Sequence, residues 1–84
     1  MEYNIEARIK VYIEDPKSIP NVKSHIEKLV KVVKFWEEDV GFGIKALKAV
    51  VLMNDSEGGM DQLEEKIRGI EHVGQFEVES VSRV

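Results

Sequence analysis

The chain has 84 residues, a length that suits one small domain with a modest hydrophobic core. Apolar residues make up 43% of the sequence, which is typical of a globular protein and argues against disorder. The absence of cysteine excludes disulfides, cysteine zinc sites and thiol nucleophiles, and it is compatible with a reducing cytoplasm. The net charge is −4, concentrated in residues 53–84, where three basic residues accompany eight acidic ones. This acidity disfavours non-specific nucleic-acid binding and favours a protein partner.

The N-terminal part of the chain predicts a strand and then a helix. Residues 3–13 alternate apolar and polar side chains, which indicates a half-buried strand. From Ser18 onward, apolar residues recur every three or four positions, which predicts an amphipathic helix with Pro20 in its first turn. The apolar stripe of this helix consists of Val22, Ile26, Leu29, Val30 and Val33. The start of the chain lacks an apolar signal-peptide core, and we expect no membrane-spanning segment.

The middle of the chain predicts two strands. Residues 34–36 form the first, a short one, and the acidic cluster 37–39 that follows it is expected to be a solvated edge. Residues 47–53 form the second, apolar enough to be buried on much of both faces. Alternation fails near Lys45, so we expect a bulge or bend at the start of that strand.

The last third predicts a turn, a helix and a final strand. Residues 54–59 have turn composition. The next apolar stripe is Met60, Leu63, Ile67 and Ile70, in a helix that Gly69 or Gly74 ends. Residues 75–79 alternate again, with Phe76 and Val78 expected to face the helices. Continued alternation puts Glu77, Glu79, Val81 and Arg83 on the opposite side.

The predicted order is β-α-β-β-α-β over one domain, residues 1–84. Two split βαβ units with right-handed crossovers give the ferredoxin-like sandwich, an α+β fold with a four-stranded antiparallel sheet and both helices on one face. The expected core is Ile5, Ile9, Val11, Ile26, Leu29, Val33, Leu47, Val51, Leu63, Ile67 and Val78.

The segment Val-Gly-Phe-Gly-Ile-Lys-Ala, residues 40–46, is the most unusual local pattern. Glycines on both sides of Phe42 permit a sharp bend, so the ring either folds back into the core or is displayed for use. The spacing Gly41-x-Gly43-x-x-Ala46 resembles a relaxed dinucleotide fingerprint, but the match is weak, because an acidic run precedes it and a β-rich run follows it. A single-strand RNA-binding domain stays an alternative, because Gly41-Phe42-Gly43 on the third strand resembles the base-stacking motif of RNA-recognition domains.

Signals for bond-making chemistry are weak. His25 and His72 are far apart in sequence and have no ligand spacing, and no nucleophile and base pattern stands out. We therefore expect a binding protein that is not an enzyme, with no cofactor and no metal site.

The blocks "GFGIKALKAVVLMND" and "EGGMDQLEEKI", together with the ending "VESVSRV", carry a family resemblance. They resemble the guanine nucleotide exchange domain family of translation elongation factor 1-beta, and in particular its archaeal members. The resemblance implies an exchange factor that promotes GDP release and GTP rebinding on the GTPase elongation factor 1-alpha in the cytoplasm, with no direct nucleic-acid partner and no membrane.

The resemblance also implies roles for particular residues. Phe42, with Gly41, Gly43 and Lys45 of the same block, would bind the partner, the ring entering a pocket on the GTPase. Arg83 matches the basic residue next to the C-terminus, a lysine in eukaryotic members, that reaches the magnesium site of the bound nucleotide. Arginine is bulkier and planar, so it does not simply replace that lysine.

Overall fold

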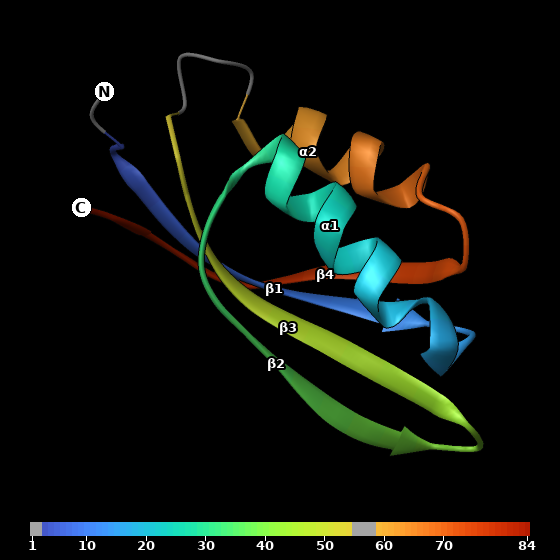
Figure 1. Cartoon of the computed structure of the whole chain (residues 1–84). Coiled ribbons are helices and arrows are strands. Elements are labelled where there is room, and N and C mark those ends of the chain that lie inside the picture. The colour runs from blue at the N-terminus through green and yellow to red at the C-terminus, as the bar shows by residue number, and fades with distance from the viewer. Residues whose placement is uncertain (1–2, 55–58) are drawn as a thin grey trace.

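The computed structural model describes residues 3–54 and 59–84, and its elements follow the predicted order (Figure 1). They are β1 (Ile5–Ile13), a short 3-10 helix η1 (Pro16–Ser18), α1 (Ile19–Leu29), β2 (Lys31–Gly41), β3 (Ile44–Met53), α2 (Gly59–Arg68) and β4 (Val73–Arg83). The strands form one antiparallel sheet in the order β2-β3-β1-β4, which confirms the predicted βαββαβ topology. The expected turn over residues 54–59 includes 55–58, which lie outside the described residues.

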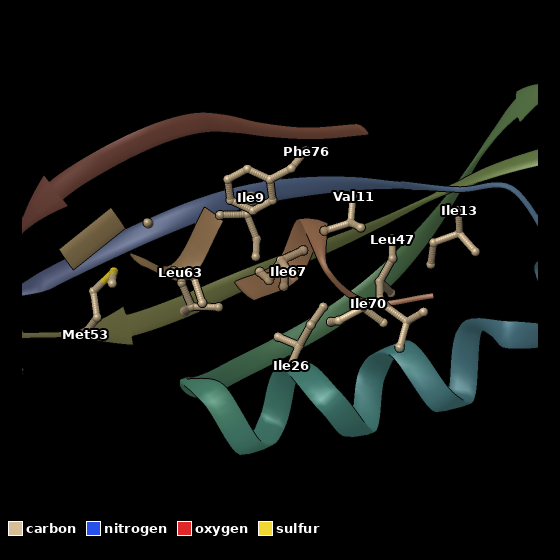
Figure 2. Close-up of a cluster of buried hydrophobic side chains, with 14 of the residues drawn as sticks. Ile9, Val11, Ile13, Ile26, Leu47, Met53, Leu63, Ile67, Ile70 and Phe76 are labelled. Carbon is tan, nitrogen blue, oxygen red and sulfur yellow. The ribbon is translucent and has the colours of Figure 1, made fainter. Parts of the chain in front are cut away.

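The core lies between the sheet and the two helices (Figure 2). Its centre is β1, whose alternate residues Ile5, Ala7, Ile9, Val11 and Ile13 are all buried. Ile26 of α1 and Ile67 of α2 are fully buried against this face and join the same cluster. Burial of apolar surface stabilises the fold by about 25 cal/mol per Å², so this single layer supplies the main driving force.

Three residues of the predicted core lie at the surface: Leu29 (38% exposed), Val33 (54%) and Val78 (38%). The predicted helical stripe continues past the end of the helix. α1 ends at Leu29, and the backbone of Val30 already has strand-like angles, with φ −154° and ψ 156°. The β-branched run that follows pairs with β3 as the start of β2, an 11-residue strand instead of the short one expected at 34–36. Val33 is then the extra residue where the register shifts between Val32 and Lys34.

The expected bulge at the start of β3 is wrong in its position. β3 begins at Ile44 and pairs with β1 without interruption from Lys45 to Met53. The irregularity lies in β2, between Asp39 and Gly41, where Val40 is the extra residue. The acidic cluster 37–39 is inside β2 and not after it; since β2 is an edge of the sheet, the expectation of a charged edge is confirmed.

A valine-to-alanine substitution at a buried and at an exposed position tests which valines belong to the core. Val51→Ala should lower the free energy of unfolding by about 2–3 kcal/mol, because it removes two buried methyl groups and leaves a cavity. Val33→Ala should cost below about 1 kcal/mol, because that side chain is exposed. Chemical denaturation of both variants measures the difference, and equal losses would contradict the core described here.

Candidate partner-binding site

A two-residue turn, Phe42-Gly43, joins β2 to β3 at one end of the sheet. Phe42 has φ 55° and Gly43 has φ 76°, the left-handed pair that a tight hairpin turn of type I′ requires. This conformation costs a residue other than glycine about 1–2 kcal/mol. The Phe42 side chain is 102% exposed, so no burial offsets that cost. A strained and fully exposed aromatic indicates a functional position.

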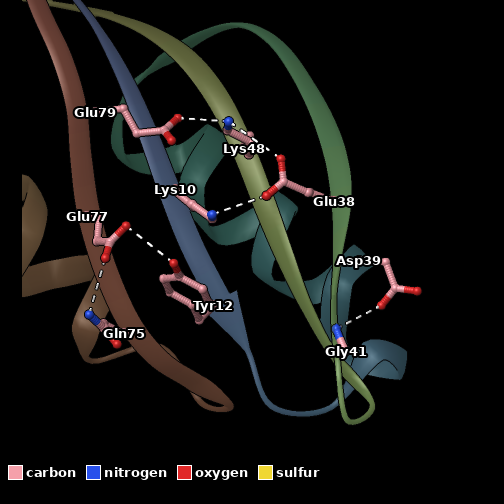
Figure 3. A network of polar contacts seen from close by, with 9 residues as sticks. All are labelled: Lys10, Tyr12, Glu38, Asp39, Gly41, Lys48, Gln75, Glu77 and Glu79. Atoms are coloured by element: carbon pink, nitrogen blue, oxygen red, sulfur yellow. Dashed lines mark hydrogen bonds and ion pairs between the residues drawn. The ribbon is translucent and has the colours of Figure 1, made fainter.

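The strand residues next to the turn fix its position. Gly41 pairs with Ile44 and Asp39 pairs with Lys45, while Val40 is skipped. The Gly41 N–H donates to Asp39 Oδ1 at 3.3 Å (Figure 3). Lys45 is half-buried and lies on the side of the sheet that carries Ile13, its β1 partner. The turn therefore brings together the predicted residues Gly41, Phe42, Gly43 and Lys45.

This geometry decides between the interpretations of Phe42 that the sequence left open. The ring is displayed and is not part of the core. It is also not on the third strand, which begins at Ile44, so the predicted register of an RNA-recognition motif is wrong. On the helix-free face, Tyr12 of β1 lies opposite Ala46 of β3, where base stacking would need a second aromatic.

Arg83 lies at the other end of the sheet, as the last residue of β4. The register against β1 shifts between Arg8 and Ile9: Ile9 pairs with Val78 and Arg8 with Ser80, which leaves Glu79 as an extra residue. Beyond this bulge, Arg83 pairs with Ile5, whose side chain faces the core. Since directly opposed residues share a face, the side expected for Arg83 is wrong: it shares the face of Phe76, and the same holds for Val81.

The bulge has a physical cause in the side chains around it. Without it, Ser80 and Ser82 would lie opposite the core-facing residues Ala7 and Ile5. With it, Val81 takes the place opposite Ala7. The Glu79 carboxylate then reaches Lys48 Nζ of β3 at 3.1 Å on the helix-free face.

A network of charged and aromatic side chains covers the helix-free face (Figure 3). Lys10 Nζ lies 3.1 Å from Glu38 Oε1, and Lys48 Nζ lies 3.8 Å from Glu38 Oε2. The hydrogen bond to Glu38 raises the pKa of Lys10 above its ordinary value, and the same bond lowers the pKa of Glu38. Lys34 and Lys48 also stack over the Trp36 ring, at 5.1 and 5.7 Å from its centroid. The lysines and glutamates of this face therefore form ion pairs mostly with one another.

In residues 3–54 and 59–84, no group of three or more His, Asp or Glu side chains is arranged to hold a metal ion. Within the same ranges, no helix is long and apolar enough to cross a membrane.

Two residues that matter for the geometry were not singled out from the sequence. Asp39 supports the turn, and its signal was present, because an aspartate two residues before a glycine often accepts a hydrogen bond from the following backbone. Glu79 forms the bulge of β4, and its signal was the change in alternation from Phe76 and Val78 to Ser80 and Ser82.

The fold and the turn define a class: a small α+β domain that presents an exposed aromatic at the tip of a hairpin. Residues 7–84 match the model of the family described as the EF-1 guanine nucleotide exchange domain. The chain belongs to this family.

Curated relatives support the assignment over nearly the whole chain. Elongation factor 1-beta of Aeropyrum pernix is 42% identical over 82 residues, which covers 90% of this chain and 91% of that protein. The protein of the same name from Thermoplasma acidophilum is 41% identical over 71 residues, covering 83% and 81%. The one from Pyrococcus abyssi is 38% identical over 91 residues, covering 99% and 98%.

Solved structures confirm the fold alone. The C-terminal domain of the MgtC protein from Mycobacterium tuberculosis superimposes with a TM-score of 0.71 at 16% identity, covering 100% of this chain and 92% of that one. The ACT domain of GTP pyrophosphokinase from Chlorobium tepidum gives 0.70 at 18% identity, covering 89% and 97%.

Two phenylalanines provide a matched test of the displayed ring. Phe76→Ala should cost about 3–5 kcal/mol of unfolding free energy, because Phe76 is buried in the core. Phe42→Ala should change it by less than about 1 kcal/mol, because the exposed ring leaves no cavity. Thermal and urea unfolding measure both. A loss at Phe42 as large as that at Phe76 would contradict the exposed position of the ring.

Proposed function

We propose that this chain promotes GDP release and GTP rebinding on elongation factor 1-alpha by contacting that GTPase with both ends of its sheet. Guanine nucleotide exchange is the function of the family to which it belongs. In the proposal, Phe42 is the anchor at the hairpin end, supported by Gly41, Gly43 and Lys45. Arg83 is the charged group at the other end. Residues 1–84 act as one exchange domain, in the cytoplasm where translation takes place.

The observation that carries the anchor role is the cost of displaying Phe42. A phenylalanine that is fully exposed in a left-handed turn gains nothing for the fold. Buried aromatic anchors dominate the binding energy of many protein interfaces. Entry of the ring into a pocket on the partner would offset the strain and account for the residue.

The two contacts act at separate places. Along β1, Ile13, beside the hairpin end, lies eight positions after Ile5, which pairs with Arg83. At about 3.4 Å per residue this spacing is roughly 27 Å. The proposal therefore requires two different sites on the GTPase, one for the ring and one for the charge.

The role proposed for Arg83 follows from the electrostatics of a GTPase. Magnesium bridges the nucleotide phosphates to the GTPase, and a second positive charge at its site would repel it. A partner that binds the magnesium-free conformation more tightly must weaken nucleotide binding by the same factor. GDP then leaves, and GTP rebinds because it is more abundant in the cell. The exchange reaction makes and breaks no covalent bond, so the protein is not an enzyme in the bond-making sense.

The anchor is tested by release of fluorescent GDP from elongation factor 1-alpha at increasing concentrations of the domain. Phe42→Ala should raise the half-saturating concentration by about 10- to 30-fold, the loss that truncation of an interface anchor brings. Leu29→Ala, which shortens another exposed apolar side chain, is the control and should not change it. An unchanged half-saturating concentration for Phe42→Ala would refute the anchor.

Arg83 is tested in the same assay by its maximal rate at saturating domain concentration while free magnesium is varied. Arg83→Glu should lower the maximal rate strongly, because a carboxylate attracts magnesium, whereas Arg83→Lys should preserve it. Arg68→Glu reverses the charge of an exposed arginine on α2 and serves as the control. If Arg83→Glu exchanges at the unmutated rate at every magnesium concentration, Arg83 does not act on the magnesium site.

A further inference from the structure

We infer that Asp39 is a positioning residue for the partner contact, acting through the backbone of the hairpin tip. The inference rests on the proposed anchor role of Phe42. Asp39 itself lies in β2, three residues before the ring, and is exposed.

The ring depends on its own backbone for its direction. Phe42 is 102% exposed, so packing within this chain does not orient it. The direction of its Cα–Cβ bond is set by three successive left-handed residues, Gly41 (φ 91°), Phe42 (φ 55°) and Gly43 (φ 76°). Two of the three are glycines, which lose more conformational freedom on ordering than any other residue. A tip of this composition needs a fixed attachment to keep one conformation.

Asp39 supplies such an attachment. Its Oδ1 atom accepts the Gly41 N–H at 3.3 Å (Figure 3) and so spans Val40, the extra residue of β2 at this end of the strand. An extra residue on β2 without a counterpart on β3 would let the tip rotate. The carboxylate ties Gly41, the first residue of the tip, back to the pair that precedes the bulge, Asp39 with Lys45.

Because of its position, this hydrogen bond should affect binding and not the stability of the fold. It lies at the exposed tip of a hairpin whose strands are held by the ladder between β2 and β3. Its loss should leave the fold intact and increase the number of directions that the ring samples. The binding-competent direction is then populated less, which weakens the apparent affinity by the same fraction.

The test is a double-variant cycle in the GDP-release assay with the full chain. Asp39→Ala should raise the half-saturating concentration about three- to tenfold, the change that loss of one hydrogen bond typically brings, and leave the maximal rate unchanged. Asp39→Asn retains the Oδ1 acceptor and should restore the unmutated value. In the Phe42→Ala background, Asp39→Ala should have no further effect, because the ring through which it acts is absent. Glu37→Ala, two residues earlier on the same strand, is the control and should be neutral.

The outcomes distinguish this inference from the anchor proposal. If Phe42→Ala has no effect, the anchor proposal fails, and the inference fails with it. If Phe42→Ala weakens exchange but Asp39→Ala is neutral, or is equally harmful with and without the ring, the anchor stands and the positioning role of Asp39 is wrong. A variant Asp39→Asn as weak as Asp39→Ala would show that the charge matters and the hydrogen bond does not, which also overturns it.

Discussion

The alternating apolar side chains of β1 organise both the core and the two faces of the sheet. The strand's five buried aliphatic side chains form the centre of the core, and β3 and β4 pair with it on either side. Because opposed residues share a face, β1 determines which side chains of its neighbours are covered by the helices and which lie on the helix-free face. The same strand separates the two ends of the sheet, so it also sets the distance between the hairpin that carries Phe42 and the C-terminal residue of the ladder, Arg83.

The hairpin turn places an exposed ring at a position where phenylalanine lowers local stability. Asparagine or glycine would suit the first position of such a turn, and phenylalanine does not. The fold tolerates this local cost because the surrounding ladder holds the turn in place. β2 and β3 form nine Cα pairs between Lys31 and Gly41. The proposed role of Phe42 would benefit from such a turn, since an anchor already held in its bound direction loses less entropy on binding. The helix-free face contributes differently: its lysines and glutamates form ion pairs that link β1, β2, β3 and β4.

The sequence was sufficient for the element order and for most of the core, because β1 and the two helices bury clean periodic stripes. It failed where two patterns overlapped. Val30 and Val33 continue the helical spacing of α1, yet a run of valines also favours a strand, and pairing with β3 decided the outcome. It failed again at Glu79, since one extra residue reverses every later side chain and periodicity alone does not reveal a bulge. The exposure of Phe42 could not be derived from its neighbours, because two flanking glycines permit a ring to turn inward or outward equally.

In the proposed mechanism, the sheet holds two partner contacts, Phe42 and Arg83, at a fixed separation. The most direct test of this separation lengthens the hairpin by two residues in each strand, between Glu38 and Asp39 and between Lys45 and Ala46, which are adjacent cross-strand pairs. This insertion keeps every side chain on its face and moves the tip outward by about 7 Å. The measurement is the rate of GDP release from elongation factor 1-alpha. We expect the lengthened domain to unfold at the unmutated denaturant concentration but to promote exchange as slowly as Phe42→Ala. Exchange at the unmutated rate would contradict a fixed separation between the ring and Arg83.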